Sequence, residues 1–172
     1  MTLDIELLNK SRHNRKTFDC GQPEVSSFLQ TQARPQMEKK INRTWVVVDC
    51  ETQQSEPFPI AGYFTLTQGS VVRQELPASY SQSGFPRYPV PVIKLAWLGV
   101  AQEYQRSTYR MGETLLLEAL DQAQRIIEHS GLGVAIVVDP LTEASSNFFQ
   151  KYGFQKMERS FGHQKTLFLP IP

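Results

Sequence analysis

The residues best suited to chemistry lie in a short polar stretch, residues 105–112. Within eight positions the chain places two guanidinium groups and two aliphatic hydroxyl groups, carried by Arg106, Ser107, Thr108 and Arg110. All four side chains donate hydrogen bonds well to phosphate oxygens. Gly112 closes the stretch, and a residue without a side chain lets the backbone approach a ligand closely. The composition of this stretch favours an anion site, above all for phosphate.

The elements around this stretch place it at the start of a helix. A buried strand is expected at 92–100, and residues 112–128 predict the clearest helix of the chain, with one apolar face formed by Leu116, Leu120, Ala123 and Ile127. The first turn of a helix presents unpaired backbone N–H groups and a partial positive charge, which suits phosphate. Many strand–loop–helix junctions bind nothing, however, so the pattern alone leaves that alternative open.

The remaining chain predicts an α+β fold in a single domain, residues 1–172. Further strands are expected at 44–48, 60–72, 134–138 and 164–169. Short helices are expected at 21–34, around Met37 after the break at Pro35, and at 144–152.

Composition narrows the function classes. The chain has no apolar run long enough to span a membrane and no signal peptide at its start, so we expect a cytoplasmic protein. Cys20 and Cys50 lack metal-ligand spacing; we expect two reduced thiols and no metal. The net charge of +1 does not indicate nucleic-acid binding overall. Two basic clusters, at 12–16 and 39–43, are either solvated surface or contacts for a polyanion such as RNA.

Two motifs resemble the GNAT family of N-acetyltransferases. Gln105-Arg-Ser-Thr-Tyr-Arg-Met-Gly112 and the helix after it resemble the family's acetyl-CoA motif, (Arg/Gln)-x-x-Gly-x-(Gly/Ala), and the segment 137–154 resembles its second landmark. The stretches 18–21, 43–44, 61–67 and 86–91 resemble one branch of the family, which includes the aminoacyl-tRNA-acetylating toxins of bacterial toxin–antitoxin pairs. The resemblance covers residues 12–170.

This resemblance implies a GNAT fold, with a central mixed, twisted β-sheet flanked by helices. It implies an acetyl-CoA-dependent N-acetyltransferase that acylates a primary amine, such as the α-amine of charged tRNA, as a toxin with a cognate antitoxin. By analogy with the toxins, the chain is also expected to form a homodimer. Two alternatives remain: a catalytically degenerate module that binds CoA or a protein partner, and an acetyltransferase for small molecules or protein lysines.

The resemblance also assigns roles to residues. Main-chain groups of Leu98, Gly99 and Val100 would hold the acetyl and pantetheine groups, with the Val100 N–H polarising the thioester carbonyl. The remaining acetyl-CoA contacts would come from Arg106, Ser107, Thr108, Tyr109, Arg110, Met111, Gly112, Glu113 and Asn147. The basic residues expected to contact RNA are Lys39, Lys40, Arg43 and Arg87.

The chain departs from the family pattern in two places. The loop from Gln105 to Gly112 is longer than the motif by two residues, and if Ser107 is taken as its opening position, Arg110 replaces the inner glycine. The family's proton-donating tyrosine falls on Phe149, which has no proton to give to the leaving thiolate. Tyr152 is the first substitute; the other candidates are Tyr109, Ser145 and water.

Overall fold

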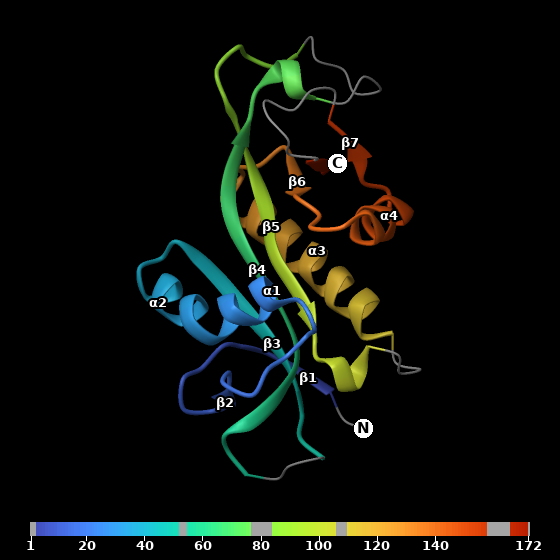
Figure 1. Ribbon diagram of the computed structural model, residues 1–172. Coiled ribbons are helices and arrows are strands. Elements are labelled where there is room, and N and C mark those ends of the chain that lie inside the picture. Colours follow the sequence, from blue (N-terminus) through green and yellow to red (C-terminus); the bar gives the residue numbers. More distant parts are fainter. Residues whose placement is uncertain (1–2, 52–54, 77–83, 106–109, 158–165, 172) are drawn as a thin grey trace. The chain divides into compact units, whose positions relative to one another are not determined.

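Segments rich in β-branched and aromatic residues form the long strands of a mixed sheet in the computed structural model of this chain, which describes residues 3–51, 55–76, 84–105, 110–157 and 166–171. The longest strands are β3 (Asn42–Asp49), β4 (Phe58–Val71) and β5 (Val90–Val100). The strand order is β1-β3-β4-β5-β6-β8-β7, and β2 pairs with β4 outside this path (Figure 1). Only β5 with β6 and β2 with β4 are parallel among the described pairings.

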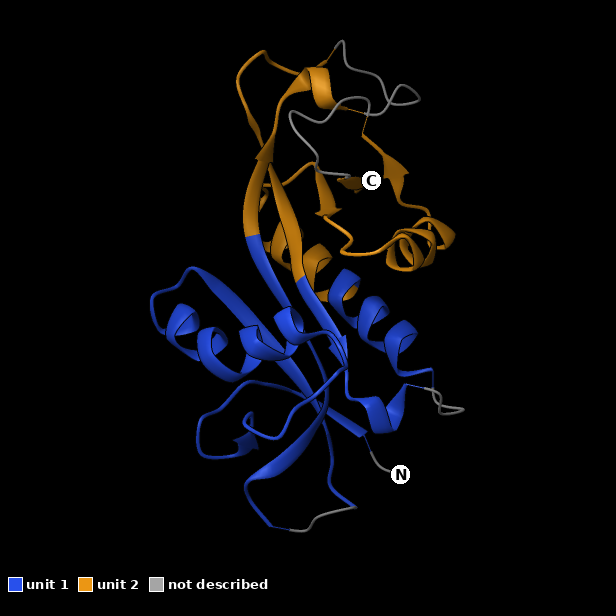
Figure 2. Ribbon diagram, viewed as in Figure 1, with its two compact units in different colours: residues 1–67, 97–120 blue, residues 68–96, 121–172 orange. Residues whose placement is uncertain are grey.

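The chain forms two compact units, shown in Figure 2. Unit 1 comprises residues 1–67 and 97–120, and unit 2 comprises residues 68–96 and 121–172. Because the boundaries cut through β4, β5 and the long helix α3 (Met111–Ser130), each of these elements contributes to both units.

In unit 1, β1 (Leu3–Leu7) and β4 flank β3 on either side, both antiparallel to it, and β2 (His13–Asn14) pairs with the start of β4. Helices α1 (Pro23–Ser27) and α2 (Ala33–Glu38) are joined by a π-helical turn, Phe28–Gln32. Their apolar residues pack with the strands into one core, whose members include Phe18, Val25, Phe28, Leu29, Val46 and Tyr63.

The predicted break between these helices at Pro35 is wrong. Pro35 is the third residue of α2, the chain stays helical from α1 into α2, and the irregular segment is the π turn between them. Pro23 occupies the first turn of α1, as its position in the sequence indicated.

In unit 2, β6 (Ala135–Val138) lies between β5 and β8 (Leu167–Pro170), and β7 (Gln155–Lys156) pairs with β8. The four residues of β6 are all buried, as expected of a strand that is covered on both faces. Thr142 caps the N-terminus of helix α4 (Glu143–Lys151), and its hydroxyl accepts a hydrogen bond from the Ser145 N–H at 3.0 Å.

Helix α3 extends one residue before and two residues beyond its predicted bounds. Its inward face is buried at Leu115, Leu116, Ala119 and Ala123. Gly131 ends it with φ +74°, a conformation that glycine adopts without steric cost. Among the described residues no helix is both long and apolar enough to cross a membrane.

Candidate functional site

The end of β5 offers backbone groups that the neighbouring strand does not use. The parallel ladder between β5 and β6 ends at Leu95 and Val138, whereas β5 continues to Val100. Along residues 96–100, the edge that faced β6 therefore has no β6 partner in the described part of the ladder. Exposed main-chain N–H and C=O groups of this kind can pair with an extended ligand.

Gly99 allows this strand end to lie tightly against the core of unit 1. A Cβ placed on Gly99 would lie 2.7 Å from Val25 Cγ1 and 3.3 Å from a ring carbon of Tyr63. Leu98 and Val100 are half-buried on either side of it. Position 99 therefore has no room for a side chain larger than that of glycine.

Most of the predicted phosphate loop lies outside the residues that the structure describes. Arg106, Ser107, Thr108 and Tyr109 lie outside the described residues, and their assigned contacts stay predictions. The loop begins after a 3-10 turn, Gln102–Tyr104, and ends at Arg110.

The start of α3 has the features of an anion site. Arg110 precedes the helix with φ +46°, the left-handed conformation in which glycine is usual. Its side chain is 80% exposed, and its Nη1 lies 3.6 Å from Glu113 Oε2. The Thr114 N–H donates to the Arg110 carbonyl at 3.0 Å, so the first turn contributes the amides of Met111, Gly112 and Glu113, which precede the intrahelical ladder. The buried Met111 side chain anchors this turn.

The family tyrosine position lies in an aromatic cluster on α4. Phe149 is 6% exposed and packs edge-on against Phe148 and Phe154, with ring centroids 5.4 and 5.6 Å apart. Tyr152 follows the helix, half-buried, with its ring 5.2 Å from that of Phe148. Phe149 is thus a packing residue, and Tyr152 is the hydroxyl-bearing ring of this cluster.

Two further residues of α4, Asn147 and Ser145, were assigned roles from the sequence, and they differ in their surroundings. Asn147 is exposed on the helix. Ser145 completes the helix cap, since its hydroxyl lies 2.9 Å from the Thr142 hydroxyl. Its hydroxyl therefore already has a structural use.

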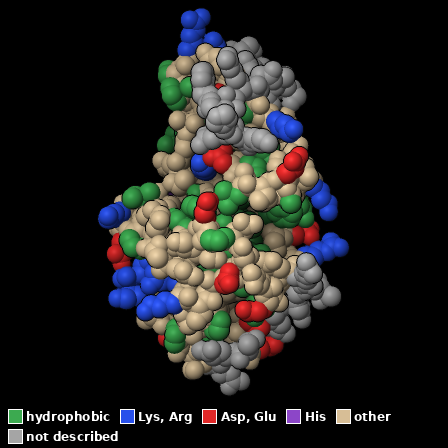
Figure 3. Space-filling model, viewed as in Figure 1, with side chains coloured by type: hydrophobic (Ala, Val, Ile, Leu, Met, Phe, Trp, Pro, Cys, Tyr) green, Lys and Arg blue, Asp and Glu red, His purple; other side chains and the backbone are tan. Residues whose placement is uncertain are grey.

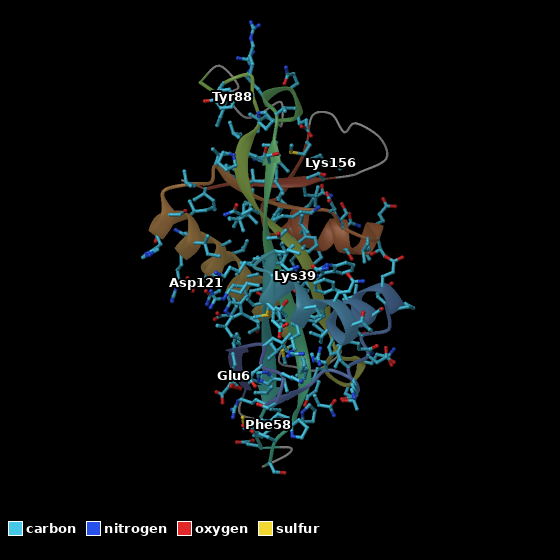
Figure 4. The ribbon with its side chains drawn as sticks, turned by 90° about the vertical axis from the view of Figure 1, so that its left-hand side faces the viewer. Glu6, Lys39, Phe58, Tyr88, Asp121 and Lys156 are labelled. Carbon is cyan, nitrogen blue, oxygen red and sulfur yellow. The ribbon has the colours of Figure 1, made fainter. Side chains whose placement is uncertain are left out.

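Of the residues assigned to RNA, Lys39, Lys40 and Arg43 lie together in unit 1, between the end of α2 and the start of β3, and all three are exposed. Figure 3 shows lysine and arginine side chains gathered over α2, and Figure 4 labels Lys39. Arg87 is exposed in unit 2.

The earlier basic cluster, at 12–16, is in part neutralised. Arg12 Nε lies 2.6 Å from Glu6 Oε2, its Nη1 lies 3.1 Å from Glu56, and its guanidinium lies over the ring of Phe58. His13 is buried, and its Nδ1 accepts a hydrogen bond from the Asn9 N–H at 2.9 Å. Burial lowers the pKa of His13, although Glu6, 3.5 Å from Nε2, opposes the shift. These two residues are therefore structural.

The side-chain contacts of Asp139 and Gln105 were not anticipated from the sequence. Asp139 accepts a hydrogen bond from Thr166 at 2.5 Å and pairs with Lys94 Nζ at 2.6 Å, where the β5–β6 ladder ends. The side chain of Gln105 binds two backbone carbonyl groups. An aspartate directly after an apolar strand was the available signal for the first. Within the described residues no group of three or more His, Cys, Asp or Glu side chains is placed to hold a metal ion.

No family model matches the sequence. A curated relative, "Probable toxin TacT" of Sinorhizobium fredii (strain NBRC 101917 / NGR234), is 24% identical over 174 residues, which cover 97% of this chain and 90% of the relative.

Solved structures match over nearly the whole chain. AtaT complexed with acetyl-methionyl-tRNAfMet gives a TM-score of 0.83 at 24% identity, with 98% of this chain and 95% of that chain covered. AtaTR bound with acetyl-CoA gives 0.78 at 25% identity, with 98% and 93% covered. A tyrosine-to-phenylalanine mutant of AtaT, bound to the C-terminus of the antitoxin AtaR and to acetyl-CoA, gives 0.74 at 22%, with 98% and 92% covered.

These likenesses confirm the predicted fold, a mixed sheet with flanking helices. The curated relative and the structure of AtaTR also confirm the resemblance to the toxin branch of the GNAT acetyltransferases.

Proposed function

We propose that this chain is an acetyl-CoA-dependent N-acetyltransferase, a toxin that transfers the acetyl group to the α-amine of aminoacyl-tRNA in the cytoplasm. The observation that carries the proposal is the course of β5: its end, which extends beyond the described ladder with β6, leads through a short turn and loop to the first-turn amides and the exposed arginine at the start of α3. An extended backbone edge followed by an anion site matches a thioester arm that ends in a diphosphate. The likeness to AtaTR with acetyl-CoA supports this choice of donor.

In the reaction, the acceptor nitrogen attacks the thioester carbonyl and releases one proton to solvent, an amide bond forms, the C–S bond breaks, and the thiolate leaves. The Val100 N–H stabilises the negative charge that develops on the carbonyl oxygen. An aminoacyl ester has an α-amine that is substantially neutral near pH 7–8, so no strong base is required.

Tyr152 protonates the leaving thiolate. Phe149 cannot do so, and the Ser145 hydroxyl is already engaged in the helix cap. General acid catalysis of this kind contributes about 10²–10⁴-fold to rate.

Lys39, Lys40 and Arg43 contact the phosphates of tRNA. They are exposed, they lie together and, unlike Arg12, no ion pair of theirs is found among the described residues. AtaT, of the same fold, was solved with an acetylated methionyl-tRNA, and its mutant with the C-terminus of an antitoxin. A cognate antitoxin is therefore the proposed protein partner.

The test is incubation with radiolabelled acetyl-CoA and a mixture of charged tRNAs, beside lysine-containing peptides and free amines. We expect label on the aminoacyl ester, with a rate that falls steeply as salt rises. Label on peptides or free amines, insensitive to salt, would instead establish the small-molecule or protein acetyltransferase.

A second candidate function is a CoA-binding module without turnover, and the buried Phe149 favours it. Calorimetry with acetyl-CoA separates the two. Binding without transfer to any amine would replace the first proposal with this one, and absence of binding would remove both.

A further inference from the structure

The turn that leads into the predicted phosphate loop is fastened to a distant segment of unit 1. The Gln102 N–H donates to the Asp19 carbonyl at 3.0 Å. Gln105 Nε2 donates to the Cys20 carbonyl at 2.6 Å and to the Val100 carbonyl at 2.8 Å. One amide nitrogen thus binds both the end of β5 and the segment 19–21, and we call this arrangement the Gln105 clamp.

The segment 19–21 is shaped to receive this turn. Gly21 has φ +87°, and its N–H donates to Asp19 Oδ1 at 2.9 Å. A Cβ on Gly21 would lie 2.9 Å from Gln102 Nε2, so a side chain there would press against the turn. Both sides of the clamp are anchored in the core of unit 1, through Cys20 on one side and Ala101 on the other.

The clamp continues into the helical segment that carries the basic residues. The Cys20 N–H donates to Ser26 Oγ of α1 at 3.0 Å, and the buried Tyr63 hydroxyl donates to the Val25 carbonyl at 2.6 Å. From α1 the chain is helical through the π turn and α2, and then reaches Lys39 and Lys40. A continuous set of contacts therefore connects the start of the donor loop with the exposed basic residues.

We propose that Gln105 is a positioning residue that holds the end of β5, the turn after it and the α1–α2 segment in one fixed arrangement, so that donor and acceptor bind in register. This inference rests on the proposed function. Its chemical content is specific: the Gln105 side chain acts as a double N–H donor to two backbone carbonyls. A carboxylate of the same shape has no N–H and repels both carbonyl oxygens, whereas a guanidinium has several N–H donors.

The test compares Gln105→Glu, Gln105→Ala and Gln105→Arg. Calorimetry should show acetyl-CoA binding weakened about three- to tenfold by Gln105→Ala, more by Gln105→Glu, and nearly unchanged by Gln105→Arg. If Gln105 serves only to fill space, Gln105→Glu should match the wild type and Gln105→Arg should be the worst, which would overturn the inference. Gln124→Glu, at an exposed position of α3, controls for the change of charge.

Steady-state kinetics provides a second readout. Because the clamp positions both substrates, Gln105→Glu should raise KM for acetyl-CoA and for charged tRNA while kcat changes less. A fall in kcat with both KM values unchanged would contradict a positioning role. If Gln105→Glu does not fold, the contrast between Gln105→Arg and Gln105→Ala decides in the same way.

Hydrogen exchange separates this inference from the proposed function. The amides of Cys20 and Gln102 should exchange faster in Gln105→Glu than in the wild type, without any ligand present. Unchanged exchange would overturn the clamp even in an active enzyme. If the wild type does not bind acetyl-CoA, the proposed function fails, and the exchange rates still decide whether the clamp exists.

Discussion

The two compact units carry different parts of the proposed chemistry. Unit 1 holds the binding features: the end of β5, the start of α3, and the exposed basic residues 39–43. Unit 2 holds α4, where an aromatic cluster occupies the position of the family's proton donor. The binding features are largely backbone groups, whereas the proton donor is a single side chain. Changes to the core and the basic side chains of unit 1 should therefore alter affinity or stability, and a change at the proton donor in unit 2 should alter rate.

The largest expected effect is at Tyr152. Tyr152→Phe should lower kcat by about 100-fold with acetyl-CoA affinity unchanged, because the leaving thiolate loses its proton donor. Rapid-quench assays and calorimetry measure the two quantities. Phe149→Tyr in the Tyr152→Phe background should restore part of the rate. Unchanged kcat in Tyr152→Phe would indicate that water protonates the thiolate.

Gly99→Ala tests the expectation that a change in the core of unit 1 alters stability. The added methyl group would lie 2.7 Å from Val25 Cγ1, so the free energy of unfolding should fall by about 1–3 kcal/mol. Urea denaturation measures this loss. Gly84→Ala is the matched control, because a Cβ there meets no heavy atom of the described residues within 4 Å. Equal stability of the two variants would show that β5 or Val25 shifts to accommodate the added methyl group at little cost in free energy.

Replacing Lys39 and Lys40 by glutamate should weaken tRNA binding about tenfold and lower the slope of log affinity against log salt by about one for each phosphate that is no longer neutralised. Filter binding over a series of salt concentrations measures both. Lys156→Glu, an exposed lysine of unit 2 (Figure 4), should leave the slope unchanged. The same loss in that control would mean that RNA responds to net charge alone.

Arg110→Gly should raise the free energy of unfolding by about 1 kcal/mol or less, because glycine takes φ +46° without strain. Acetyl-CoA affinity should fall at the same time, since this variant lacks a phosphate donor. Lys40→Gly removes a similar strain, at φ +61°, at the end of α2 and should leave acetyl-CoA affinity unchanged. A loss of affinity in both variants would point to a general effect of strain relief.

The smallest expected effect is the pH dependence due to His13. Because burial lowers the pKa of His13 in the folded state, the unfolded chain binds the proton more readily, and stability should fall as pH falls below about 6.5. Urea denaturation at pH 7.5 and 5.5 should show this loss in the wild type and a smaller one in His13→Gln. The exposed His129 of unit 2 gives the control, His129→Gln, which should behave as the wild type does.

The sequence predicted the long elements because their patterns are strong. The apolar face of α3 and the all-apolar β6 each indicated one structure clearly, and the bounds were nearly right. β1 was missed, because its alternating Leu-Asp-Ile-Glu-Leu is short and becomes a strand only by pairing with β3. That the two units fold as one domain stays a prediction.

The site was predictable where the chemistry is local and unpredictable where it depends on distant contacts. The start of α3 after a strand and a polar loop follows from the local pattern and a glycine, and its role as an anion site stays a prediction. The sequence does not show that one basic cluster is partly neutralised and the other is exposed, because Glu6 and Glu56 reach Arg12 only in the folded chain. The contact of Gln105 with Cys20 spans 85 positions and left no trace in the local pattern.

The contact between Gly99 and Val25 has a consequence for the evolution of related chains. The space that a side chain at 99 would need is already occupied by a methyl group from α1, a helix far from it in the sequence. A lineage that acquires alanine at 99 should therefore carry a smaller residue at 25, and the two positions should vary together. The double variant Gly99→Ala/Val25→Ala would retrace that path in a single protein.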